Sequence, residues 1–80
     1  MRPLLKRGDR GPAVRELQTL LKAAGYYQDG NLDQILGPKT EAAVIDFQQD
    51  TSRLVVDGLV GPNTWGALDG VLVQTPTEPE

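Results

Sequence analysis

The sequence predicts a small all-α fold, a three-helix bundle with an internal helix-turn repeat and structured loops. Gly-Pro pairs begin at Gly11, Gly37 and Gly61, and proline is favoured in the first turn of a helix, where its missing N–H costs no hydrogen bond. Apolar residues follow each pair at helical spacing. The stretch Asp33–Thr40 also resembles Asp57–Thr64, 24 residues later, with the same Asp, Gly, Pro and Thr and apolar pairs between them. The chain therefore repeats a turn that leads into a helix.

The length and the composition bound the domain. The chain has 80 residues, which suffice for one domain near the lower size limit for folding without disulfides or metals. We assign residues 1–73 to this domain. Residues 74–80 alternate proline with threonine and glutamate and contain no apolar side chain, which is typical of a tail or linker. We therefore expect the domain to be part of a longer protein.

The first helix is expected from Pro12 to about Ala24. Residues 1–10 form an irregular lead-in, in which Leu4 and Leu5 are able to lie against a core. Gly25 follows the helix at the usual C-terminal capping position. One apolar stripe runs along this helix, made of Val14, Leu17, Leu20, Leu21 and Ala24.

The second helix is expected from Pro38 to about Asp50. A structured loop over residues 26–36 leads into it, with turn-forming residues at 29–31. The helix is expected to bury Ala43, Val44 and Phe47, and to expose Glu41, Asp46 and Asp50.

The third helix is expected from Pro62 to about Asp69, with Gly70 closing it. Residues 54–56 form a short extended piece before the turn that precedes this helix. Trp65 and Leu68 are three residues apart and share one helix face, so we expect this single tryptophan in the core.

Two glutamines occupy similar places in the first two helices. Gln18 and Gln48 each follow an apolar stripe residue directly. Buried backbone groups of loops need hydrogen-bond partners, and a side-chain amide both donates and accepts. We expect both glutamines to hold loop backbone.

The composition argues against several function classes. The chain contains no cysteine and no histidine, so it lacks the usual zinc ligands and the commonest general base. Residues 1–27 carry a net +4 and residues 28–80 a net −7. The basic residues lie mostly between Arg2 and Arg15, where the chain has no aromatic residue, which disfavours nucleic acid as a partner. No apolar run is long enough to span a membrane. We expect no catalytic residue, metal or cofactor, and a monomer.

Read together, the motifs resemble the peptidoglycan-binding domain family, small three-helix modules attached to bacterial and phage cell-wall hydrolases. The resemblance covers about residues 4–70 and rests on Leu5, Gly8, Gly11, Val14, Leu17, Gln18, Leu21, Gly25, Tyr26, Gly37, Pro38, Thr40, Ala43, Val44, Phe47, Gln48, Val56, Asp57, Gly58, Val60, Gly61, Pro62, Thr64, Trp65 and Leu68. Two positions depart from the family pattern, since Gln34 and Arg53 stand where members usually have glycine.

The resemblance implies non-catalytic binding of peptidoglycan, outside the cytoplasm at the cell wall or in the periplasm, or in a phage lysin. The implied partners are the glycan strand or the stem peptide, and a covalently linked catalytic domain. The alternative is a protein-interaction or pro-domain-like module that contacts a neighbouring domain. The related metalloprotease pro-segments ligate zinc through a cysteine, which this chain lacks.

The loop over residues 26–34 is the predicted ligand-binding site. A glycan with peptide stems has apolar sugar faces and many amides, so aromatic rings beside amide and carboxylate groups suit it. The same residues are also ordinary turn formers, which leaves a purely structural role open. The predicted ligand-binding residues are Tyr26, Tyr27, Asp29, Asn31 and Gln34.

Overall fold

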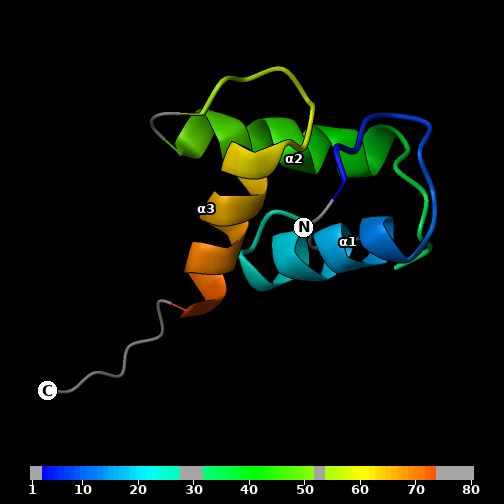
Figure 1. Cartoon of the computed structure of the whole chain (residues 1–80), viewed down its shortest axis with the longest axis horizontal. Coiled ribbons are helices and arrows are strands. Elements are labelled where there is room, and N and C mark those ends of the chain that lie inside the picture. The colour runs from blue at the N-terminus through cyan, green and yellow to red at the C-terminus, as the bar shows by residue number, and fades with distance from the viewer. Residues whose placement is uncertain (1–2, 28–31, 52–53, 74–80) are drawn as a thin grey trace, which may run out of the picture.

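The computed structural model describes residues 3–27, 32–51 and 54–73, with only the backbone for 71–73. Within these residues the chain forms three helices, α1 (Pro12–Ala23), α2 (Pro38–Asp50) and α3 (Pro62–Val73). The described loops form two isolated antiparallel bridges, Leu5 with Val60 and Arg10 with Ile35. Figure 1 shows α1 and α2 running along the length of the molecule, with α3 directed across them. The predicted all-α fold is confirmed, and the predicted tail, residues 74–80, lies outside the described residues.

Helix α1 ends as the sequence predicts. Gly25 follows the C-cap residue and has a φ of 90°, a conformation that favours glycine because a Cβ would be strained there. Its N–H donates to the Lys22 carbonyl, and the Tyr26 N–H donates to the Leu21 carbonyl. These two bonds form a Schellman motif, which satisfies carbonyls that the end of the helix leaves free.

Helix α3 is longer than expected. The prediction that Gly70 closes it near Asp69 is wrong, because the helix continues to Val73. Gly70 is not among the glycines with positive φ. A glycine at a helical φ weakens a helix by about 1 kcal/mol without ending it. The presence of Gly70 was therefore not enough to locate the end of α3.

The core lies where the three helices meet the loops. Gly58, in the second turn, and Thr40, at the start of α2, are buried. The predicted stripe residues of α1 and α2 are also buried, with one exception. Ala24 is only half-buried. The buried apolar side chains are Leu5, Val14, Leu17, Leu20, Leu21, Tyr27, Leu36, Ala43, Val44, Phe47, Val60, Trp65 and Leu68.

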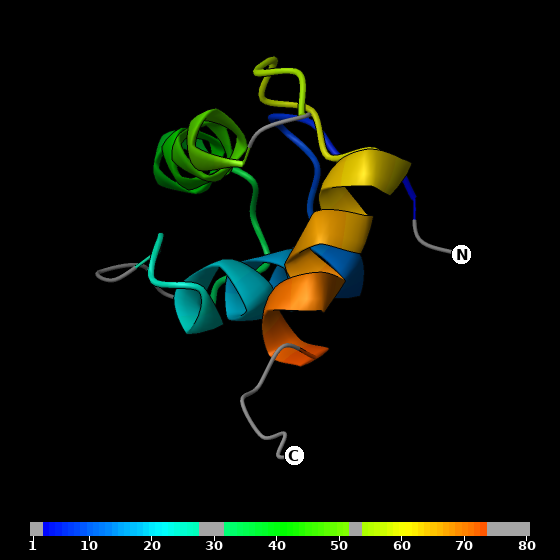
Figure 2. The same cartoon turned by 90° about the vertical axis from the view of Figure 1, so that its left-hand side faces the viewer.

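The N-terminal segment, residues 3–11, ties the two repeated turns together. Its Leu5 exchanges two backbone hydrogen bonds with Val60, with N···O distances of 3.1 and 2.9 Å. Further along, the N–H of Gly8 donates to Leu36 and that of Gly11 to Gln34. Figure 2 shows this segment, in dark blue, passing between the loop before α2 and the loop before α3.

Trp65 is in the core, as predicted, with 4% of its surface exposed. Its indole N–H donates to the Pro3 carbonyl at 2.9 Å. Of the two lead-in leucines, Leu5 is buried, whereas Leu4 is 59% exposed. The start of the chain therefore covers the tryptophan and leaves one leucine on the surface.

Glu41 differs from the prediction. It is half-buried rather than exposed, because Arg7 of the N-terminal segment forms an ion pair with it at 3.3 Å. Asp46 and Asp50 are exposed, as predicted. The contact to Glu41 joins residues 34 positions apart, so helical periodicity could not reveal it.

Candidate functional site

The first repeated turn is organised around the buried side chain of Gln18. Its amide nitrogen lies 2.9 Å from Asp33 Oδ1, 3.1 Å from the Ile35 carbonyl and 3.0 Å from Thr40 Oγ1. Its carbonyl oxygen accepts the Gln34 N–H at 3.1 Å. One glutamine of α1 thus fixes the turn that starts α2.

The second turn repeats this arrangement around Gln48. The amide nitrogen lies 3.3 Å from Asp57 Oδ1, 2.9 Å from the Leu59 carbonyl and 3.3 Å from Thr64 Oγ1. The carbonyl oxygen accepts the N–H groups of Asp57 and Gly58 at 3.2 and 2.9 Å. The predicted role of both glutamines is confirmed.

The two turns share a left-handed residue at equivalent positions. Gly58 has a φ of 74°, and Gln34 has a φ of 65°, the one positive φ of a non-glycine residue in the described part of the chain. This conformation costs an L-residue about 1–2 kcal/mol relative to glycine. Gln34 thus adopts the backbone of the glycine that the family usually has here.

Hydrogen bonding lowers the pKa of Asp33. The Gln18 amide is the main cause, and the Ile35 N–H adds to it, because both donate to the charged carboxylate. The carboxylate therefore stays ionised and holds its turn at neutral pH.

Tyr26, the first predicted ligand residue, is half-buried at the end of α1. Its ring meets Phe47 edge to face, with centroids 5.4 Å apart. Its hydroxyl donates to Asp50 Oδ2 at 2.7 Å, and this bond raises the pKa of the phenol. Part of the ring and the hydroxyl remain at the surface beside α2.

Tyr27 turns inward. It is 5% exposed and belongs to the core. Its hydroxyl lies 3.4 Å from the Gln18 amide nitrogen and 3.2 Å from Thr40 Oγ1. The structural role that the sequence left open therefore applies to Tyr27, whose ring face lies in the core.

Of the other predicted ligand residues, Gln34 is the one that lies within the described part of the chain. Asp29 and Asn31 lie outside the described residues. Gln34 is half-buried, and its backbone N–H and carbonyl are both engaged, by Gln18 and Gly11. Among the described members, Tyr26 and Gln34 keep partly exposed side chains.

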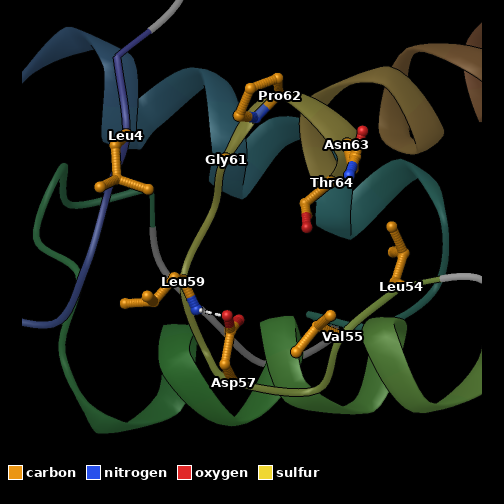
Figure 3. Close-up of a pocket in the computed structure, with 9 residues that line it drawn as sticks. All are labelled: Leu4, Leu54, Val55, Asp57, Leu59, Gly61, Pro62, Asn63 and Thr64. Carbon is orange, nitrogen blue, oxygen red and sulfur yellow. Dashed lines mark hydrogen bonds between the residues drawn. The ribbon is translucent and has the colours of Figure 1, made fainter.

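A pocket of about 190 Å³ lies beside the second turn, and sequence analysis did not identify it. Figure 3 shows Leu4 and Leu59 on one side of it, Val55 on the other, and the start of α3 above. The lining residues are Leu4, Leu54, Val55, Asp57, Leu59, Gly61, Pro62, Asn63 and Thr64.

A sequence signal for this pocket existed. Val55, Val56 and Leu59 lie outside any helical stripe yet flank a turn, and they are 72%, 46% and 40% exposed. Leu4 could not be connected to them from spacing, because a backbone bridge between Leu5 and Val60, residues far apart in the sequence, holds the N-terminal segment beside this turn.

Other kinds of site lack support in the described part of the chain. No three His, Cys, Asp or Glu side chains there are grouped so as to hold a metal ion. None of the helices in the described ranges is both long and apolar enough to cross a membrane. Asp46 and Asp50 lie on an exposed helix face.

The chain is similar to a spore cortex-lytic enzyme and to an uncharacterised protein. It is 43% identical over 61 residues to the spore cortex-lytic enzyme of Bacillus subtilis, covering 76% of this chain and 20% of that protein. An uncharacterised protein of Kitasatospora aureofaciens is 46% identical over 67 residues, 84% of this chain and 56% of that protein. The chain thus spans about half or less of these relatives.

Two crystal structures share the fold. The SleB N-terminal domain superposes with a TM-score of 0.79 at 38% identity, covering 86% of this chain and 92% of that domain. The endolysin of Burkholderia phage AP3 gives a TM-score of 0.75 at 44% identity, covering 82% of this chain and 24% of the endolysin.

The family model agrees with the repeat seen in the structure. The peptidoglycan binding domain model matches residues 10–68, which include both glutamine-centred turns and most of the three helices. By this match, the chain belongs to the peptidoglycan binding domain family.

Proposed function

We propose that this domain binds bacterial peptidoglycan without cleaving it and so holds an attached cell-wall hydrolase on its polymer. The main support for the proposal is the family match over residues 10–68. The spore cortex-lytic enzyme and the phage endolysin are wall-lytic proteins far longer than the matched region, which supports a linked catalytic domain here. The site of action is extracytoplasmic, at the wall or in the periplasm.

Weak binding suits this task. A polymer offers many identical sites, so a module of modest affinity raises the local concentration of an attached enzyme without tight binding at any one site. The lack of histidine and cysteine favours this role over catalysis.

Binding at the loop of residues 26–34 is part of the proposal. Tyr26 supports it through a partly exposed ring at the end of α1. Tyr27 supports the loop from the core instead of touching the ligand. Asp29, Asn31 and Gln34 supply the amide and carboxylate groups of this site.

Co-sedimentation with insoluble peptidoglycan sacculi tests the function. The domain pellets with sacculi and stays in solution with cellulose, at low and at moderate salt. Sedimentation that disappears at moderate salt would contradict specific binding, because exposed charges are screened there. A folded domain that remains in the supernatant would shift the search to a protein partner.

Variants at the loop test the site. Asn31→Ala lowers retention on sacculi and leaves the melting temperature unchanged, whereas Tyr27→Ala lowers the melting temperature because it empties part of the core. Unchanged retention in Asn31→Ala and in Tyr26→Ala would refute this loop as the ligand site.

A further inference from the structure

The pocket beside the second turn, defined above, has no lining residue in the described parts of the loop, residues 26–27 and 32–34. Its walls are aliphatic and partly open to solvent, with Val55 72%, Leu4 59% and Leu59 40% exposed. Three exposed aliphatic side chains around one concave site cost solvation free energy that a bound apolar group would recover.

The charge of the lining restricts the occupant. Among the described lining residues Asp57 contributes a carboxylate, and none of these residues is a lysine or an arginine. The Asp57 carboxylate would repel a ligand carboxylate or phosphate. The stem peptide carries carboxylates, whereas the sugar rings of the glycan strand are neutral, so the pocket complements the glycan.

The lining also lacks an aromatic ring. Flat sugar faces bind best on aromatic rings, so a pyranose ring is a poor fit to these walls. A small methyl group next to an amide fits better. Asn63 is exposed at the rim, and its carboxamide makes no hydrogen bond within the described part of the chain.

We propose that this pocket binds the acetamido group of an N-acetylated sugar in the glycan strand. The methyl group lies against Val55 and Leu59, and the amide pairs with the Asn63 carboxamide at the rim (Figure 3). This inference rests on the proposed function and adds a second subsite to it, next to α3 rather than α1.

Titration with two neutral oligosaccharides tests the proposal by NMR. Chitotetraose carries acetamido groups, and cellotetraose has hydroxyl groups in their place. Chitotetraose shifts the signals of Val55, Leu59 and Asn63 in a saturable manner, and cellotetraose does not. Equal shifts with both sugars, or shifts at these residues with a stem peptide alone, would overturn the assignment.

Adjacent valines supply a matched pair of variants. Val55 lines the pocket and Val56 does not, although both are exposed in the same extended piece. Val55→Gln weakens chitotetraose binding about threefold, the effect of losing one methyl-sized apolar contact. Val56→Gln binds like the parent chain, and both variants keep its melting temperature. Equal affinities in the two variants would refute the pocket.

Sedimentation with sacculi separates this inference from the proposed function. If the parent chain fails to pellet with sacculi, the function is refuted. If it pellets and chitotetraose leaves the pocket signals unchanged, only the pocket assignment is refuted.

Discussion

The two repeated turns, Asp33–Thr40 and Asp57–Thr64, have the same hydrogen-bond pattern with different residues at the strained position. In each, a buried glutamine amide holds an aspartate, a backbone carbonyl and a threonine. The left-handed residue is glycine in the second turn and Gln34 in the first. The comparison shows that the hydrogen bonds of the buried glutamine maintain the left-handed backbone conformation even where the residue is not a glycine.

The turns also differ in their surroundings. The first packs against the Tyr27 hydroxyl, which lies within hydrogen-bond distance of Gln18 and Thr40. The second borders the aliphatic pocket, with Asn63 where the first repeat has Lys39. The same hydrogen-bonded turn therefore has a different outer face in each of its two copies.

The largest expected effect comes from removing the central amides. Gln18→Leu and Gln48→Leu each lower the free energy of unfolding by about 2–4 kcal/mol, because each leaves buried backbone groups without partners. Urea denaturation measures both losses. Gln49→Leu, at the exposed neighbouring position, is the control and changes stability little.

Losses of less than 1 kcal/mol in both variants would show that the networks do not fix the turns. A large loss in only one would show that the two turns are not energetically equivalent.

A smaller effect is expected at the left-handed positions. Gly58→Ala destabilises the domain by about 1–2 kcal/mol, because a φ of 74° strains a residue with a Cβ. The nearest atom to that Cβ is Glu41 Oε2 at 3.5 Å, an ordinary contact, so conformation and not a clash causes the loss.

The reciprocal change, Gln34→Gly, stabilises the domain by about 0.5–1 kcal/mol, after the extra unfolded-state entropy of glycine is subtracted from the relieved strain. Thermal melts of both variants check the pair. A Gln34→Gly variant less stable than its parent would mean that the Gln34 side chain contributes more than its backbone strain costs.

The smallest effect concerns pH. The folded-state pKa of Asp33 lies below its ordinary value of 3.8. Its contribution to stability is therefore present above that value and is lost as the pH falls through the folded-state pKa. Asp33→Asn reduces the loss of melting temperature between neutral pH and about pH 3. Asp9 retains its own acid sensitivity in both proteins, since the Lys6 N–H lowers its pKa too. Identical pH profiles would exclude a role for Asp33.

Local patterns were sufficient to predict where the three helices begin and what role the two glutamines have. Gly-Pro pairs set the starts of α1, α2 and α3, and apolar spacing identified the buried faces of α1 and α2. Gln18 lies four residues after the stripe residue Val14, and Gln48 lies four residues after Val44. Each glutamine therefore shares the core side of its helix.

Features that depend on distant segments could not be predicted in this way. Glu41 is half-buried because Arg7 reaches it, and the pocket combines Leu4 with residues after α2. Tyr27 faces the core because the Schellman motif before it sets the direction of the chain. Whether α3 continues past Gly70 depends on a small free-energy difference, between the gain from extending the helix and the cost of placing a glycine inside it.

The N-terminal segment has a consequence for where this folding unit begins. The family match starts at residue 10, yet Pro3 receives the Trp65 indole bond and Leu5 pairs with Val60. Because these contacts join residues more than 50 positions apart, loop closure makes them costly to form early in folding. A shortened chain that starts at Arg10 would expose the tryptophan, so domain grafting should carry residues 3–9 along with the matched region.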